Sequence, residues 1–345
     1  MAMLVSIKQA EQMTVSILEA GLVPHIKGSP GVGKSDLVRQ IAKKYNLYVI
    51  DFRLAQCDPT DLVGFPTLNA DRTRAHYAPP ITIPIAGDEI PEGYKGWLLF
   101  FDEMTSAPRS VQAASYKVIL DRMVGTYKIH PKVAMIAAGN LETDKAIVTA
   151  TSTALQSRLI HINVDVDTNI WLQWAAKAEI DYRILGFIRF RPNLLMKFNP
   201  SHSEDTFPCP RTWDFLSRII KNKVTIPLEE LPLLAGTIGQ GTGSEFHGFC
   251  QIFESLPTQH TILNYPDQVQ IPNDPSIKYA LSALLGNLVT EENIEKLMRV
   301  IMKLPSEFQI LTLRDVLANN ITMQANPVVK DWVRVNSREL LAYSE

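Results

Sequence analysis

The amino-acid sequence predicts an α/β fold, with a parallel sheet covered by helices, followed by a smaller region that is helical throughout. Two observations predict this class. Up to about residue 164, short apolar runs alternate with stretches whose apolar residues recur at helical spacing, and this alternation is typical of parallel sheets. After about Asp167 the short runs stop, and helical patterns alone continue.

Five short runs are candidates for the strands. Four of them are rich in branched or aromatic residues and short enough to be buried, namely residues 47–52, 97–101, 133–138 and 159–164. A weaker candidate covers residues 22–26, where Pro24 lacks the N–H group that a sheet ladder needs. We therefore expect that strand to begin at or near Pro24.

Helices are expected between and after these strands. Residues 35–45 place Leu37 and Ile41 four positions apart, as a helix with one apolar face does. In the second half the clearest helical patterns cover residues 171–178, 213–221 and 276–288.

Three glycines interrupt the helical region at positions 239, 241 and 243. We interpret them as a helix-to-helix turn, because no strand precedes them. Thr242 and Glu245 have the spacing of a capping box, which would open the next helix.

Composition excludes several classes of protein. The 345 residues suggest about two domains, at roughly 150 residues each. Lys and Arg total 34 against 36 Asp and Glu, so the formal charge of -2 offers no general basic field for a nucleic acid. The longest apolar runs, such as residues 97–101, are far shorter than the roughly 18 residues of a membrane span. We expect no membrane association.

Cysteine usage and the N-terminus bear on location. Three widely spaced cysteines without a C-x-x-C pair are typical of a reducing cytosol. Residues 1–14 carry charged residues in a helical pattern and lack a cleavage site after an apolar core, so we do not expect a signal peptide. A cytoplasmic location is expected.

A phosphate-binding loop is the strongest motif in the chain. Residues 28–35, Gly-Ser-Pro-Gly-Val-Gly-Lys-Ser, fit G-x-x-x-x-G-K-[ST] between a candidate strand and a helical pattern. The backbone N–H groups of such a loop point inward at phosphate oxygens, which assigns cofactor binding to Gly28, Ser29, Pro30, Gly31, Val32 and Gly33. Lys34 should reach the β- and γ-phosphates, and the Ser35 hydroxyl should bind Mg²⁺.

Two adjacent carboxylates follow a buried strand pattern. Asp102 and Glu103 come directly after residues 97–101, which places them at the carboxyl end of that strand. Asp102 is suited to hold Mg²⁺, and Glu103 to orient and deprotonate an attacking water. Such a pair could instead form a solvated turn.

Two further side chains are candidates for the reaction. Asn140 ends the next strand pattern, where its amide could position the same water or contact the γ-phosphate; it could also be a turn asparagine. Arg158 lies just before the last strand and could neutralise charge on the transferred phosphoryl group, although a lone arginine is usually a surface charge.

These motifs resemble those of an AAA+ ATPase, specifically the MoxR-like, dynein-related branch. The similar segments are residues 28–35, 56–66, 98–103, 122–140 and 210–216, so that the resemblance covers residues 1 to about 220. Residues 243–257 are similar to the helical C-terminal region of the phage and prophage form of this branch, which implies a bacterial cytosol or a phage-infected cell.

The resemblance implies a P-loop NTPase fold with a five-stranded parallel sheet, a helical lid and a helical C-terminal extension. The corresponding domains are residues 1–166, 167–260 and 261–345. It also implies ATP and Mg²⁺ as cofactors, and a ring that is usually a hexamer, with ATP between neighbouring subunits.

In such a ring three arginines acquire roles. Arg158 is similar to the arginine finger that completes the neighbouring subunit's site. Arg211 matches the second sensor of the γ-phosphate, acting in cis or in trans, although it could equally be a helix-start cation paired with Asp214. Arg109 is a weaker candidate for a contact between subunits.

The branch also carries two β-hairpin insertions that face the pore or axial surface of the ring. The candidates are residues 67–79, with Arg72, Arg74 and Tyr77, and residues 123–131, with Tyr127. A hairpin that is merely solvated is equally compatible with the pattern. Target selection is expected in these hairpins, in the helical C-terminal region or in a separate protein, and a partner with a von Willebrand factor A domain commonly serves in this branch.

The predicted function is that of an ATP-driven, chaperone-like ATPase that remodels protein complexes. A nucleic-acid motor or loader is the main alternative. Its best support is a basic row interleaved with aromatic residues, formed by Arg183, Arg189, Arg191 and Lys197, although that pattern is also typical of a packed lid helix. A second alternative is a nucleotide-gated binding protein with little turnover.

Overall fold

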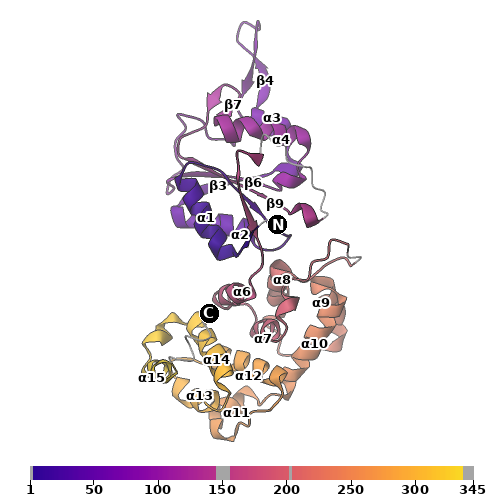
Figure 1. Cartoon of the computed structure of the whole chain (residues 1–345), viewed down its shortest axis with the longest axis vertical. Helices are drawn as coiled ribbons and strands as arrows, with labels where there is room; N and C mark the ends of the chain where they lie inside the picture. Colours follow the sequence, from indigo (N-terminus) through magenta and orange to yellow (C-terminus); the bar gives the residue numbers. More distant parts are fainter. Residues whose placement is uncertain (1–2, 145–155, 202–203, 337–345) are drawn as a thin grey trace. The chain divides into compact units, whose positions relative to one another are not determined.

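The computed structural model describes residues 3–144, 156–201 and 204–336. It divides into two compact units, one of Met1–Asp167 with Asn199–His202, and one of Thr168–Phe198 with Ser203–Glu345. The first unit holds the sheet and the second is helical, as the change of pattern near residue 167 predicts (Figure 1).

The main sheet has six strands among the described residues, all parallel, in the order β1-β10-β2-β9-β6-β3. Their bounds are Leu4–Val5, Ile160–Val164, Pro24–Lys27, Val133–Gly139, Gly96–Asp102 and Leu47–Arg53, in that order. Five strands match the five apolar runs, and β2 begins at Pro24 as expected.

The expectation of five strands is therefore wrong by one. The additional strand, β1, has two residues and pairs with β10 at the edge of the sheet. Leu4 is exposed and Val5 is only partly buried, so this strand lacks the run of apolar residues that marks a buried strand in a sequence.

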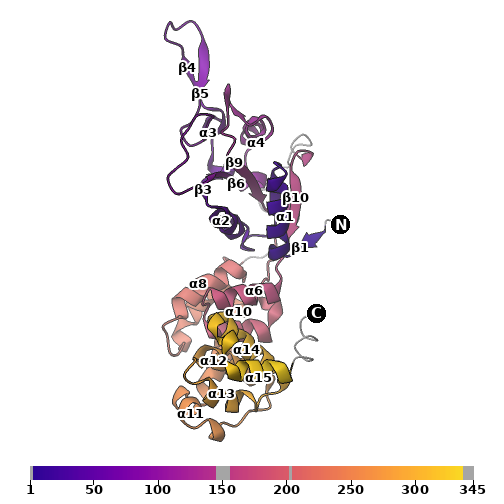
Figure 2. The same cartoon turned by 90° about the vertical axis from the view of Figure 1, so that its left-hand side faces the viewer.

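Helices cover both faces of the sheet. On one face, α1 (Ile7–Glu19) and α2 (Lys34–Tyr45) pack on buried residues of the central strands, among them Ile26, Leu98 and Ile136. On the other face, α3 (Pro59–Val63) and α4 (Arg109–Tyr116) pack on a second group of buried residues that includes Leu99 and Phe101. Figure 2 shows these helices beside the sheet. The central strands thus have buried apolar residues on both faces, as parallel sheets require.

Both predicted insertions are antiparallel hairpins. Strand β4 (Phe65–Leu68) pairs with β5 (Ala75–Ala78), and β7 (Met123–Val124) pairs with β8 (Tyr127–Lys128). The first hairpin extends beyond the body of its unit (Figure 1). The turn of the second hairpin lies against the first, because a Cβ on Gly125 would be 3.2 Å from Cβ of Tyr77.

The second unit is built from helices around an aromatic centre in which Phe187, Trp213 and Phe246 contact one another. Helices α6, α8 and α12 correspond to the three clearest helical patterns. The helices are α6 Thr168–Lys177, α7 Tyr182–Phe190, α8 Pro210–Ile220, α9 Leu231–Ile238, α10 Gln240–Ser255, α11 Gln259–Asn264, α12 Pro275–Leu288, α13 Ile294–Ile301, α14 Ser306–Asn319 and α15 Pro327–Val335. Within the described residues, no helix is both long and apolar enough to cross a bilayer.

The interpretation of the three glycines is correct for one of them. Gly239, with φ of 83°, separates α9 from α10, whereas Gly241 and Gly243 lie inside α10. The expected capping box at Thr242 is wrong, because α10 begins at Gln240, whose N–H donates to the Glu204 carboxylate. Gly243 allows α9 and α10 to pack closely, since a Cβ there would lie 2.9 Å from the backbone nitrogen of Ala235.

Candidate nucleotide-binding site

The phosphate loop joins β2 to α2 at the carboxyl edge of the sheet. Gly31 and Gly33 have φ of 82° and 98°, the left-handed region that glycine adopts without a steric cost. Gly28 is needed for a different reason, since a Cβ there would be 2.9 Å from the carbonyl oxygen of Val164. The loop therefore curls tightly at the N-terminus of α2, where helix N–H groups lack partners within the helix.

Lys34 is buried, and its ammonium group spans the loop. It donates hydrogen bonds to the carbonyl oxygens of Gly28 at 2.6 Å and Ser29 at 3.0 Å, and to Oδ1 of Asn140 at 3.2 Å. The side chain is 9% exposed. The structure thus places the predicted phosphate-binding cation and the predicted amide in direct contact.

Ser35 and Asp102 also meet at this edge. The Ser35 hydroxyl donates to Oδ2 of Asp102 at 3.0 Å, although the two residues are 67 positions apart. Both groups present oxygen atoms, the ligands that Mg²⁺ prefers. The donor set fits the ion that the sequence assigns to these two residues.

Glu103 follows with a strained backbone. Its φ of 57° lies in the left-handed region, which is uncommon for a residue other than glycine and costs on the order of 1–3 kcal/mol. Its N–H donates to Oδ1 of Asp102 at 2.8 Å. Glu103 directly precedes η2 (Met104–Ser106), a 3-10 helix of one turn. The two carboxylates of the predicted pair therefore have different settings.

Two buried polar residues join this site that the motifs do not contain. The Thr105 hydroxyl contacts the backbone of Asn140. Asp144 accepts a hydrogen bond from the Ser29 hydroxyl at 3.0 Å and one from the Leu141 N–H at 3.2 Å. Both side chains are nearly inaccessible to solvent. The sequence offered one indication of them, because each lies within five positions of a predicted site residue.

The three candidate arginines are exposed, in contrast to Lys34. Arg158 lies just before β10, and Arg109 lies at the start of α4. Arg211 is the second residue of α8 in the other unit. Its suggested pairing with Asp214 is not what the structure has, because the Asp214 carboxylate accepts a hydrogen bond from Arg218.

In the basic row of the second unit, two side chains are buried and two are exposed. Arg183 forms a bidentate ion pair with Asp181, with N–O distances of 2.9 and 2.8 Å, and both side chains are buried. Arg189 pairs with the buried Asp315. Arg191 is exposed, and its Nε lies 3.6 Å from a carboxylate oxygen of Glu245. Lys197 is also exposed. Arg183 and Arg189 are thus packed inside their unit, so these two residues do not support a nucleic-acid interface.

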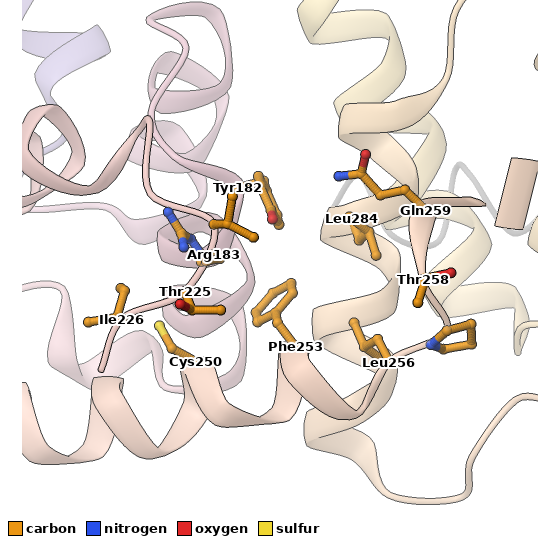
Figure 3. Close-up of a pocket in the computed structure, with 12 residues that line it drawn as sticks. Tyr182, Arg183, Thr225, Ile226, Cys250, Phe253, Leu256, Thr258, Gln259 and Leu284 are labelled. Atoms are coloured by element: carbon orange, nitrogen blue, oxygen red, sulfur yellow. The ribbon is translucent and has the colours of Figure 1, made fainter. Parts of the chain in front are cut away.

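A pocket of about 190 Å³ lies beside Arg183 in the second unit. Figure 3 shows the side chains around it, which include Tyr182 of α7, Phe253 of α10 and Leu284 of α12. Because Asp181 already neutralises Arg183, the pocket presents no net charge that a phosphate would need. The phosphate loop remains the candidate nucleotide site.

Comparison with known proteins agrees with this geometry. Residues 25–159 match the family model of the AAA domain of the dynein-related subfamily. No curated protein sequence matches the chain.

The solved structures that are similar to this chain include the following three. One is a provisionally named ATPase from Cytophaga hutchinsonii, 15% identical, covering 97% of this chain and 90% of that one, with a TM-score of 0.34. The others are RuvB from Thermotoga maritima, as a proline-to-glycine mutant (15% identity, 86% and 88% covered, TM-score 0.40) and as the Holliday junction branch migration motor (14% identity, 86% of each chain, TM-score 0.36). By its sheet and its phosphate loop, the chain has the fold of an AAA+ P-loop NTPase, and residues 25–159 are similar to the AAA domain of the dynein-related subfamily.

Proposed function

We propose that this protein is a Mg²⁺-dependent ATPase of the MoxR-like branch, in its phage or prophage form, which forms a ring and remodels protein complexes. One observation carries the hydrolytic part of the proposal. Lys34 is bonded to Asn140 and Ser35 to Asp102 at one edge of the sheet, with Glu103 adjacent. A phosphate-binding cation, an oxygen pair for a metal, a base and an amide are the groups that phosphoryl transfer to water uses.

Each group has one task in this mechanism. Lys34 neutralises the β- and γ-phosphates, while Ser35 and Asp102 supply oxygen ligands for the ion. Mg²⁺, when bound there, offsets negative charge on the phosphates.

The remaining two groups act on water. Glu103 accepts a proton as the water oxygen bonds to the γ-phosphorus and the bond to the ADP oxygen breaks. The Asn140 amide holds the water or a γ-phosphate oxygen. The proton then passes from Glu103 to the released phosphate or to solvent, which restores the carboxylate.

Two arginines extend the proposal to a ring, in which we take the subunit number to be six. Arg158 is exposed just before β10, a setting that suits a finger reaching a neighbouring subunit's ATP. Arg211, exposed in the second unit, is proposed as the second sensor. Loss of the γ-phosphate then changes the contacts of both arginines, which is the difference in binding that a mechanical step requires.

The hairpins are proposed to contact the protein target. Phe65, Leu68 and Tyr77 on the first hairpin are exposed at 62%, 55% and 48%, and exposed apolar side chains that gather on one element indicate an interaction surface. Arg72 and Arg74 lie on the same hairpin. A partner with a von Willebrand factor A domain is proposed to deliver the target. Cys57, Cys209 and Cys250 form no disulfide within the described residues, and this suits the reducing cytosol that we propose as the location.

Mixed rings test hydrolysis and its location together. Glu103→Gln protein should bind ATP without turnover, and Arg158→Ala protein should assemble but lose about 10³-fold or more in rate. Mixing the two should restore phosphate release, because some interfaces then combine an intact Glu103 with an intact Arg158.

The matched control replaces the Arg158→Ala protein by a Glu103→Gln/Arg158→Ala double variant, which should give no recovery. Absence of recovery in properly mixed rings would contradict a finger acting between subunits. Very low phosphate release by the wild type that Glu103→Gln leaves unchanged would instead support a nucleotide-gated binding protein. Hydrolysis that single- or double-stranded DNA stimulates in a salt-sensitive way would favour a nucleic-acid motor.

A further inference from the structure

A buried threonine connects the acidic pair to the amide. Thr105 is 1% exposed and sits in the middle of η2, two residues after Glu103. Its hydroxyl accepts a hydrogen bond from the backbone N–H of Asn140 at 3.0 Å and donates one to the Asn140 carbonyl oxygen at 3.4 Å. Asn140 is therefore held at its backbone by Thr105 and at its side chain by Lys34.

The residue before Asn140 makes room for this contact. A Cβ on Gly139 would lie 2.7 Å from both Oγ1 and Cγ2 of Thr105, closer than nonbonded atoms approach. Gly139 is not among the residues with positive φ, so its backbone conformation suits any residue. Space for Thr105 is thus the reason for a glycine at this position.

Thr105 is also fixed relative to Glu103. The turn η2 closes through a hydrogen bond from the Ser106 N–H to the Glu103 carbonyl oxygen at 2.9 Å. The buried Gln112 side chain of α4 donates to the Met104 carbonyl oxygen at 3.2 Å. Glu103 begins this turn in the left-handed conformation, and such strain persists where neighbouring contacts determine it.

From these contacts we infer that Thr105 is a positioning residue that fixes Glu103 and Asn140 relative to each other. The inference rests on the proposed ATPase function, in which both residues act on one water. Without the hydroxyl, the partly buried N–H of Asn140 loses its partner, and the turn shifts to recover one. In the proposed function, nucleotide binding depends on Lys34 and the phosphate loop. The two hydrogen bonds of the Thr105 hydroxyl go to Asn140 and not to these groups.

A pair of substitutions isolates the hydroxyl. Thr105→Val keeps the shape of the side chain and should lower kcat by about tenfold or more, since misplacing a reacting group by about 1 Å costs up to about 10²-fold. The Kd for a fluorescent ATP analogue should stay within about twofold of wild type. Thr105→Ser retains the hydroxyl and should restore most of kcat.

A double-variant cycle shows whether Thr105 acts through Asn140. In an Asn140→Ala background, Thr105→Val should cause little further loss, because the positioned amide is already absent. A purely structural role would lower kcat by the same factor in both backgrounds, and that result would overturn the inference. Wild-type kcat in Thr105→Val would do the same.

Gly139→Ala provides the second route if Thr105→Val fails to fold. It should displace Thr105 and reproduce the loss of kcat with retained nucleotide affinity, while normal kcat in a folded Gly139→Ala protein would count against the inference. Wild-type turnover is measured first. A wild-type chain that binds ATP but never hydrolyses it removes the proposed function and this inference together, whereas normal hydrolysis in both wild type and Thr105→Val removes the inference alone.

Discussion

Lys34 in the sheet unit and Arg183 in the helical unit are both buried cations, but their hydrogen-bond partners differ. Lys34 donates hydrogen bonds to the carbonyl oxygens of Gly28 and Ser29 in the phosphate loop and to the side-chain oxygen of Asn140. Arg183 is paired with the Asp181 carboxylate and donates its other bonds to the carbonyl oxygens of Ile220 and Lys223. The first set of partners is dipolar, and the second includes an anion.

This difference bears on which of the two cations can bind an anion. A bond to a carbonyl oxygen satisfies a donor without cancelling the formal charge, so an anionic ligand still gains from meeting it. A buried bidentate carboxylate cancels the charge, and a ligand that displaced it would leave a buried anion unpaired. The pocket beside Arg183 (Figure 3) accordingly lacks the electrostatic means to bind a triphosphate.

The first prediction concerns ligand binding by the first cation. Lys34→Ala should weaken ATP binding by about 100-fold or more, because charge-assisted bonds to the phosphates disappear from a buried site. Equilibrium titration with a fluorescent ATP analogue measures this loss. Lys44→Ala is the matched control, since Lys44 lies on the same helix but is exposed and bonded to Glu11. Retained tight binding in Lys34→Ala would contradict the assignment of the loop.

The second cation should matter for stability. Arg183→Met leaves the buried Asp181 carboxylate without its partner, and the free energy of unfolding should fall by about 3–5 kcal/mol. Urea unfolding followed by circular dichroism measures it.

Two further variants make this measurement specific. Arg183→Met combined with Asp181→Leu should recover part of the loss, because no buried charge is then left over. Arg218→Ala, which breaks the exposed pair with Asp214, should change stability by about 1 kcal/mol or less. Equal losses for Arg183→Met and Arg218→Ala would end the distinction between the two kinds of pair.

Much of the fold could be predicted because its evidence is local. Buried parallel strands are short apolar runs, so five of the six strands stand out, and β1 does not because two residues at an edge form no such run. Strand order could not be predicted, since it depends on pairings between distant segments. The fixed spacing of the phosphate loop likewise indicated Lys34 and Ser35.

The features that the sequence did not indicate are contacts between residues far apart in the chain. The start of α10 is set by Glu204, which lies 36 positions before Gln240, and no local capping pattern contains it. Arg189 is neutralised by Asp315, 126 positions away, so the sequence left both interpretations of the basic row open. Thr105 meets Asn140 across 35 positions, through two strand ends that only the folded sheet brings together.

The smallest expected effect concerns a third buried basic side chain, His25, which extends the comparison with Lys34 and Arg183. His25 on β2 is fully buried, and both ring nitrogens lack a hydrogen-bond partner within the part of the chain that the structure describes. Burial lowers the pKa of His25 well below 6.5, and the nearby charges of Lys27 and His161 lower it further. Unlike Lys34 and Arg183, this base is expected to stay neutral.

That neutrality predicts a pH dependence of stability with a definite sign. Below about pH 6.5 the unfolded chain binds a proton that folded His25 does not, so the free energy of unfolding should fall on acidification, by up to about 1.4 kcal/mol per pH unit. Above that pH His25 contributes no slope. His25→Leu should remove this contribution between about pH 6.5 and about pH 5.5, whereas His76→Leu, at an exposed hairpin position, should keep it. Equal slopes in wild type and His25→Leu would mean that the buried imidazole finds a proton partner after all, and that burial alone does not decide the charge of a base in this sheet.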